Sequence, residues 1–373
     1  MTAILSTREL RKDFVAARQL FGAPTLVHAV AGVSIDIEEG ETFAIVGESG
    51  CGKSTLARLL LRLIDPSSGE VWYKGEDLAS VPPARLRALR RDLQFIFQDP
   101  FSSLNPQMSV GALIEEPMRA HAIGTPKERR DRVADLLTRV GLRPEHADRY
   151  PHEFSGGQRQ RIGIARALAS GPTVLIGDEP VSALDVSIQA QVVNLLEDLK
   201  DEFGLTLVII AHDLAVIRHM ADRVAVMYLG EVVELAPAAD LYARPLHPYA
   251  ETLLAAIPVA SFGARPARTM VEGDPPNPIA PPPGCKFQPR CPYAVDICRS
   301  ERPVLTPAGD GRTVACHRAA ELSLEGLADV AHSRTATACR RFDLYAEAMA
   351  ARIASHNRLK SGDLPPQTDG GTL

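Results

Sequence analysis

The segment Gly47–Thr55, with the sequence GESGCGKST, constrains the fold more than any other part of this chain. It matches the pattern G-x-x-x-x-G-K-[ST] at every required position, follows the apolar run Phe43–Val46 and precedes a helical pattern that begins near Lys53. This context predicts a strand, a phosphate-binding loop and a helix in succession. A glycine-rich turn without a ligand is the alternative interpretation.

The loop residues have the chemistry that a bound nucleotide needs. Glycines allow backbone N–H groups to turn toward phosphate oxygens beside a helix N-terminus. Lys53 is predicted to bridge the β- and γ-phosphates, and Ser54 to supply an oxygen ligand to Mg²⁺. Cys51 is interpreted as an incidental small residue at a variable position rather than a redox switch. The predicted nucleotide-binding residues of the loop are Gly47, Glu48, Ser49, Gly50, Cys51, Gly52, Lys53, Ser54 and Thr55.

Short apolar runs alternate with helical patterns over roughly the first 235 residues. The apolar runs are 42–47, 93–97, 174–177, 205–211 and 224–229, and helical patterns cover 56–64 and 188–200. Such alternation predicts an α/β fold around a mostly parallel sheet. Residues 101–165 contain no clear strand but include a charged helical segment at 126–140, so we expect a helical insertion there.

Val174–Pro180 has the pattern of a buried strand that ends in two carboxylates, Asp178 and Glu179. Ligands bind at the carboxyl ends of strands in open α/β sheets, which would place both acids beside the phosphate loop. Asp178 is predicted to hold Mg²⁺ directly or through water. Glu179 is predicted to be the general base that deprotonates the attacking water. An acidic pair on a solvated loop is the alternative interpretation.

A second glycine motif, Ser155–Gln158, precedes another helical pattern. On its own this motif is common. In chain order, however, the phosphate loop is followed by Gln98, by Ser155–Gln158, by the acidic pair, by Ser182–Asp185 and by His212. The order and spacing of these six motifs resemble those of an ABC transporter ATPase.

The resemblance implies a role for each motif residue. Phe14 would stack on adenine, with Phe21 as a competitor for that role. Gln98 would sense the γ-phosphate and Mg²⁺ and report to the membrane subunits through the helical insertion. His212 would contact the γ-phosphate. With Glu179 present, the ATPase is expected to be hydrolytically competent.

The Ser155–Gln158 motif implies a partner ATPase. In this family the motif of one subunit completes the ATP site of another, and this chain has one copy of each motif. Two nucleotides would therefore be bound in a homodimer or in a heterodimer with a related subunit. Ser155 is also expected to be the N-cap of the following helix. The nucleotide-binding residues outside the phosphate loop are predicted to be Phe14, Ser155, Gly156, Gly157, Gln158, Asp178 and Asp185.

Three segments resemble the ATP-binding subunits of dipeptide and oligopeptide importers: Phe95–Pro106, Asp178–Asp185 and Leu246–Leu254. The resemblance implies ATP-powered peptide import with two transmembrane permease subunits and an extracytoplasmic substrate-binding protein. The chain would lie peripherally on the cytoplasmic face of the bacterial inner membrane. A nickel or glycoside importer and a soluble non-transport ABC ATPase are the alternatives. The His-Pro-Tyr sequence at 247–249 is also compatible with an ordinary helix start whose tyrosine packs inward.

Composition excludes several other classes of protein. The 41 Lys and Arg residues against 46 Asp and Glu residues give a net charge of −5, which argues against a nucleic-acid partner. The longest apolar run, Val224–Leu229, is far shorter than the ~20 residues of a membrane-spanning helix. The first ten residues lack the pattern of a signal peptide, so the chain is interpreted as cytosolic.

The C-terminal third has a different character from the predicted ATPase domain, residues 1–235. We expect a helical connection at 236–257, a Pro- and Cys-rich irregular module at 258–330, and a helix and tail at 331–373. Twelve of the 29 prolines lie between residues 258 and 307, a density that excludes long helices.

Four of the six cysteines lie close together in the sequence, at Cys285, Cys291, Cys298 and Cys316. In a cytosolic protein such a group indicates a metal centre, which would cross-link and stabilise a segment that has little regular structure. The spacing contains neither the C-x2-C pairs of zinc ribbons nor common ferredoxin spacings, so zinc, an iron–sulfur cluster and free thiols stay open. Peptide-importer ATPases with this pattern are similar to ones that carry a [4Fe-4S] cluster. The resemblance therefore implies that cluster, with Zn²⁺ as the alternative.

Overall fold

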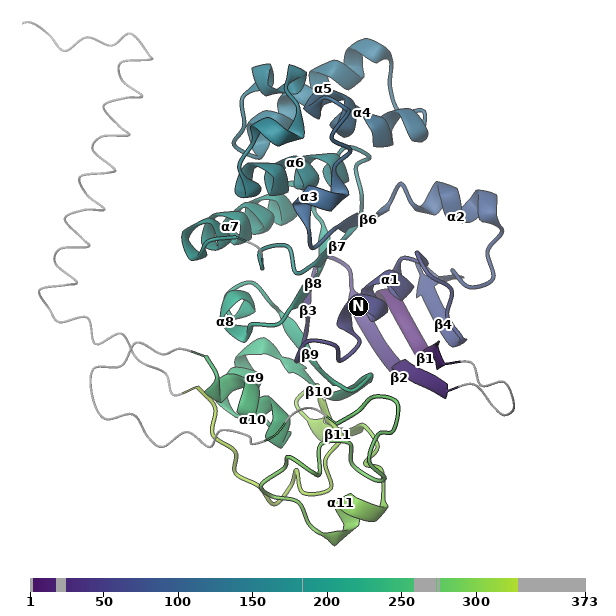
Figure 1. The fold of residues 1–373 in the computed structure, drawn as a ribbon, viewed down its shortest axis with the longest axis vertical. Helices are drawn as coiled ribbons and strands as arrows, with labels where there is room; N and C mark the ends of the chain where they lie inside the picture. The colour runs from purple at the N-terminus through teal and green to yellow at the C-terminus, as the bar shows by residue number, and fades with distance from the viewer. Residues whose placement is uncertain (1–2, 18–24, 183, 258–272, 274–275, 328–373) are drawn as a thin grey trace, which may run out of the picture. The chain divides into compact units, whose positions relative to one another are not determined.

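Five adjacent parallel strands form most of the main sheet and reach one of its edges, in the order β9-β3-β8-β7-β6 (Figure 1). They are β3 (Thr42–Val46), β6 (Leu93–Ile96), β7 (Val174–Asp178), β8 (Thr206–Ala211) and β9 (Arg223–Tyr228). The five apolar runs of the sequence are therefore confirmed as strands. The computed structural model describes residues 3–17, 25–182, 184–257, 273 and 276–327.

Alternate residues of β3 enter two separate cores, because successive side chains of a strand point to opposite faces of the sheet. Phe43 and Ile45 pack with the helix that follows the phosphate loop, α1 (Lys53–Leu60). Ala44 and Val46 pack in the core that contains α7 (Val186–Phe203). One face of β3 thus packs against the helix that follows the phosphate loop, and the other face packs against the helices on the opposite side of the sheet.

Helices occupy the segment in which the sequence predicts a helical insertion. It contains α3 (Pro100–Ser103), α4 (Val110–Ala120), α5 (Pro126–Arg139) and α6 (Gly156–Leu168), with short 3-10 turns at 144–148 and 151–153. A capping box formed by Thr125 and Glu128 begins α5. Figure 1 shows the insertion beyond the β6 edge of the main sheet.

A second, antiparallel sheet has the order β2-β1-β4-β5 and was not predicted. Its strands are β1 (Ala3–Ala17), β2 (Thr25–Glu38), β4 (Ser68–Tyr73) and β5 (Glu76–Asp77). The register of β1 against β2 shifts at several bulges, which interrupt the alternation of apolar and polar residues. This interruption hides the strands from a search for regular periodicity.

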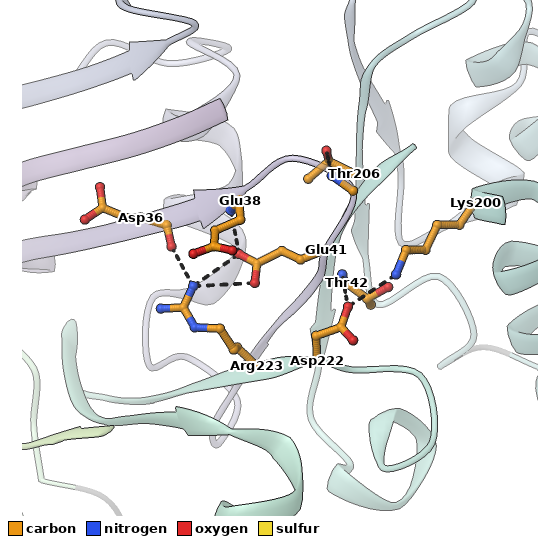
Figure 2. Close-up of polar contacts among 9 residues, drawn as sticks. Asp36, Glu38, Glu41, Thr42, Lys200, Thr206, Asp222 and Arg223 are labelled. Atoms are coloured by element: carbon orange, nitrogen blue, oxygen red, sulfur yellow. Dashed lines mark hydrogen bonds and ion pairs between the residues drawn. The ribbon is translucent and has the colours of Figure 1, made fainter. Parts of the chain in front are cut away.

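Polar contacts join this second sheet to the amino-terminal ends of the parallel strands (Figure 2). The buried Glu41 accepts hydrogen bonds through Oε1 from the Glu38 backbone N–H at 2.7 Å and from Arg223 Nη1 at 3.2 Å. Arg223 also donates to the Asp36 backbone oxygen at 3.0 Å. Asp222 Oδ2 accepts from the Thr42 backbone N–H at 2.7 Å. The amino-terminal ends of β3 and β9 are thus tied to β2.

The other edge of the main sheet is antiparallel and includes part of the cysteine-rich region. There β9 pairs with β10 (Glu231–Pro237), β10 with β12 (Arg312–Val314), and β12 with β11 (Thr306–Gly309). A buried ion pair joins Arg312 Nη2 to Glu234 Oε1 at 2.9 Å. The module expected to be irregular therefore contributes two strands to the ATPase sheet and packs with it in a unit that extends to Leu327.

The remaining helices are short. They are α2 (Pro83–Leu89), α8 (Leu214–Ile217), α9 (Ala238–Ala243), α10 (Pro248–Ala255) and α11 (Asp296–Ser300). The helical connection expected at 236–257 corresponds to α9 and α10. The helix and tail expected at 331–373 lie outside the described residues.

Candidate nucleotide-binding site

One cavity brings together the phosphate loop, Gln98 and Glu179, which come from three separate parts of the sequence. The first turn of α1 forms its floor, and residues of β2 and of the β9–β10 turn form its sides. Its lining residues are Val27, His28, Ala29, Ser49, Gly50, Cys51, Gly52, Lys53, Ser54, Thr55, Gln98, Glu179, Leu229, Gly230 and Pro278. The loop and Glu179, one of the two predicted acids, therefore face one space.

The phosphate loop is wrapped closely around its lysine. Lys53 is almost fully buried, and its Nζ donates to the backbone oxygens of Gly47 at 2.8 Å and Glu48 at 2.9 Å. Gly52 has φ +106°, and a Cβ there would lie 2.1 Å from the Ala29 backbone oxygen. No residue with a side chain fits this position, so the motif's glycine is required by the approach of β2.

Ser54 lines the cavity, and its Oγ donates to Oδ1 of Asp178, which lies beneath the lining at the end of β7, at 2.8 Å. Two neighbouring ligands of an octahedral Mg²⁺ ion lie about 2.9 Å apart when each is about 2.05 Å from the ion. This pair of oxygens therefore fits Mg²⁺. Burial raises the pKa of Asp178, and the hydrogen bond from Ser54 opposes that shift. A bound cation would favour the carboxylate that burial disfavours.

Glu179 is held at the end of β7 in an unusual backbone conformation, with φ +46°. Its Oε2 accepts a hydrogen bond from Gln98 Nε2 at 2.8 Å and lies 3.6 Å from His212 Nδ1. Backbone strain of this kind persists where the surrounding structure imposes it and is frequent at functional sites. The three residues predicted to act at the γ-phosphate are therefore brought together.

Other predicted residues do not line this cavity. Ser155 caps α6 as expected and forms a capping box with Gln158. Asp185 is exposed and precedes α7. Phe14 is 44% exposed on β1, opposite Val27, which does line the cavity. The adenine role of Phe14 stays a prediction, and its competitor Phe21 lies outside the described residues.

Comparison with known proteins identifies the family. Residues 30–182 match the family described as ABC transporter, and residues 233–298 match the C-terminal region of oligopeptide and dipeptide transporters. The probable peptide ABC transporter ATP-binding protein y4tS of Sinorhizobium fredii is 51% identical over 89% of this chain and 96% of its own length. This chain belongs to the ATP-binding subunits of peptide ABC transporters.

Two further relatives and a solved structure agree with this assignment. The oligopeptide transport ATP-binding protein AppF of Bacillus subtilis is 50% identical over 84% of this chain and 97% of its own length. The di/tripeptide transport ATP-binding protein DppF of Pseudomonas aeruginosa is 49% identical over 86% of this chain and 98% of its own length. The dimeric ATP-binding cassette MJ0796, bound to ADP and phosphate, is 31% identical with a TM-score of 0.57 and covers 63% of this chain and 98% of its own. In the described part of this ATP-binding subunit, no helix is long and apolar enough to span a membrane.

Two residues of this ATP-binding subunit contact the phosphate loop and were not predicted to do so. Tyr249, at the start of α10, is fully buried as expected, but its hydroxyl oxygen accepts a hydrogen bond from the Glu48 backbone N–H at 2.7 Å. Arg290 forms two hydrogen bonds with the Glu48 carboxylate, at 2.8 and 2.9 Å. The His-Pro-Tyr sequence marked the first of these residues, whereas nothing in the sequence pattern marked Arg290.

All four clustered cysteines line a second cavity, next to α10. None of these four, nor Cys51, forms a disulfide. Burial raises the pKa of Cys285 and that of Cys291 to about 11, and neighbouring cysteines shift both in the same direction. Within the described ranges, no group of three or more His, Cys, Asp or Glu side chains is arranged to hold a metal ion. The convergence of the thiols is found, while the metal centre stays a prediction.

Proposed function

We propose that this chain hydrolyses ATP to power the import of dipeptides and oligopeptides through a membrane ABC transporter. The observation that carries the proposal is the single cavity in which the phosphate loop, Gln98 and Glu179 meet. The chain is also about 50% identical, along most of its length, to ATP-binding proteins named for peptide transport.

The side chains of the cavity divide the chemistry between them. Lys53 would exchange its two backbone partners for phosphate oxygens and neutralise part of their charge. Glu179 would accept a proton from the attacking water, with Gln98 holding its carboxylate in place. Ser54 and Asp178 would hold Mg²⁺, which supplies charge stabilisation at the phosphates when bound.

Two chains are needed for a complete site. The segment 155–158 and Asp185 do not line this chain's own cavity, so we assign them to the site of a partner ATPase in a head-to-tail dimer. The partner is a second copy or a related subunit. Two permease subunits and an extracytoplasmic binding protein complete the transporter. The chain then lies peripherally on the cytoplasmic face of the inner membrane.

Reconstitution into proteoliposomes tests this function. The full chain, its co-purifying permease and ATPase subunits and the loaded binding protein are combined, and ATP hydrolysis is measured with peptide, nickel or glycoside as cargo. We expect hydrolysis to rise only with peptide-loaded binding protein. Stimulation by nickel or glycoside alone would replace the cargo assignment. Full activity without membrane partners would favour a soluble ATPase.

We further propose that the four cysteines hold one [4Fe-4S] cluster with a structural role. Four free thiols line one cavity, and a cluster holds its thiolates farther apart than a single ion does. A single Zn²⁺ ion held by the same thiolates is the alternative. Anaerobic purification followed by iron and acid-labile sulfide assays decides between them. One zinc per chain without sulfide would refute the cluster, and the absence of any metal would refute both.

A further inference from the structure

The cysteine-rich segment 285–291 reaches back to the phosphate loop through a buried arginine. Arg290 Nη1 and Nη2 donate to Glu48 Oε2 and Oε1 at 2.8 and 2.9 Å. The Arg290 side chain is 9% exposed and that of Glu48 is 28% exposed. A bidentate pair of this kind has a defined geometry, because the planar guanidinium matches the two carboxylate oxygens. The pair joins residues 242 positions apart in the sequence.

The carboxylate, the backbone N–H and the carbonyl oxygen of Glu48 each form a hydrogen bond that restrains the phosphate loop. Its carboxylate is held by Arg290, its N–H donates to the Tyr249 hydroxyl, and its carbonyl oxygen accepts from Lys53 Nζ. Glu48 does not line the nucleotide cavity, whereas the next residue, Ser49, does. The contacts of Glu48 therefore orient the start of the loop from its outer side.

The charge of Glu48 makes this contact consequential. A carboxylate within a phosphate-binding loop repels a triphosphate, and the repulsion is stronger where water is partly excluded. Arg290 neutralises that carboxylate and turns it away from the cavity. Loss of the arginine would leave an unpaired negative charge in the loop and free Glu48 to move.

We propose that Arg290 is a positioning residue for ATP binding, which neutralises the Glu48 carboxylate and holds it away from the cavity that accepts the triphosphate. The inference rests on the proposed ATPase function. The same contact connects the cysteine-rich segment with the nucleotide site. Arg290 belongs to a series of hydrogen-bonded turns that runs from Cys285 to Cys291. Phe287 of the same segment is buried against the rings of Tyr228 and Tyr249, at centroid distances of 5.3 and 5.4 Å.

Equilibrium binding of a fluorescent ATP analogue to the purified full chain tests the proposal, with KM and kcat measured in the reconstituted transporter. Arg290→Ala is expected to raise Kd and KM for ATP on the order of tenfold, with kcat changed less than about twofold. Adding Glu48→Gln to that variant is expected to recover most of the affinity, because it removes the unpaired charge. Tyr249→Phe, which keeps the ring and loses the hydroxyl, is expected to weaken binding by a smaller factor.

Arg299→Ala is the matched control. Arg299 also adjoins a clustered cysteine, but it is 68% exposed and pairs with Asp296. We expect it to bind ATP as the wild type does. A purely architectural role of Arg290 would lower the affinity without recovery by Glu48→Gln, and that result would overturn the proposal. Unchanged affinity in Arg290→Ala would overturn it as well. Failure of the wild type to bind ATP would instead refute the proposed function, and this inference with it.

Discussion

The two ends of the parallel strands are built for different purposes. At their amino-terminal ends, Arg223 pairs directly with Glu41, and Glu41, Asp222 and Arg223 also bond to backbone groups (Figure 2). The polar groups there are thus satisfied within the protein. At their carboxyl ends, the oxygen atoms that accept hydrogen bonds from Lys53 Nζ within the described residues are loop carbonyls, and the Asp178 carboxylate accepts a hydrogen bond from Ser54. The first end stabilises the fold, whereas the second keeps its charges for a ligand.

A shared property makes the comparison informative. Burial raises the pKa of Glu41 at one end and of Asp178 at the other. Arg223 opposes the shift for Glu41 by its charge, in addition to the Glu38 backbone N–H. For Asp178 the largest opposing contact is the hydrogen bond from the neutral Ser54 hydroxyl, and the charges of Arg58 and Lys53 oppose the shift less. Both carboxylates therefore keep a raised pKa, and the two ends differ in the partner: Glu41 pairs directly with the Arg223 guanidinium, whereas Asp178 is bonded to a hydroxyl group.

Glu179→Gln is expected to have the largest effect. It removes the general base and keeps the shape, so ATP hydrolysis should fall by at least about 100-fold while ATP binding is retained. Steady-state hydrolysis and gel filtration with ATP measure this, and an ATP-bound dimer should accumulate. Glu202→Gln, at a half-exposed glutamate that pairs with Arg139, is the control. Wild-type turnover in Glu179→Gln would refute the assignment of the acidic strand end.

Arg223→Ala tests the structural end and should have the next largest effect. It leaves the buried Glu41 carboxylate without its cation, and we expect Tm to fall by about 5 °C at pH 7 with turnover per folded molecule unchanged. Protonated Glu41 needs no cation, so the loss should shrink as the pH falls through its raised pKa. Thermal melts across pH measure both effects.

The control for that variant is Arg8→Ala, because the Arg8–Asp36 pair is half exposed and such pairs contribute little to stability. Equal losses in the two variants would show that burial of Glu41 does not matter. A loss of turnover in Arg223→Ala at a temperature where it is folded would remove the distinction between the two ends.

Asp178→Asn should have the smallest effect and the opposite sign. The amide can still accept from Ser54 and has no charge to desolvate, so Tm without ATP and Mg²⁺ should rise by about 2 °C at pH 7. Because the pKa of Asp178 is raised in the folded protein, protonation of this residue stabilises the fold. The stabilisation is fully present below the pKa of an aspartate in the unfolded chain, and it is lost as the pH rises through the pKa of Asp178 in the folded protein. The advantage of the variant should therefore disappear in acid. Asp201→Asn at an exposed aspartate is the control, and a lower Tm for Asp178→Asn would contradict the comparison.

The parts of the fold that were predicted correctly depend on short-range chemistry. The phosphate loop, the N-cap at Ser155 and the apolar strands are each defined within a few residues, where the spacing of residue types reports directly on geometry. The second sheet was missed because bulges in β1 disturb its alternation, and its β5 strand has two residues.

By itself, the sequence predicted a nucleotide-phosphate site at Gly47–Thr55 and correctly put Asp178 and Glu179 at the end of a buried strand. Those conclusions need only motif chemistry and the rule that ligands meet the carboxyl ends of parallel strands. Tertiary structure alone decided that Arg290 and Tyr249 hold Glu48. The reason is physical, since a bidentate ion pair across 242 positions forms only after β10 and β12 have joined the ATPase sheet and α10 has packed into its core.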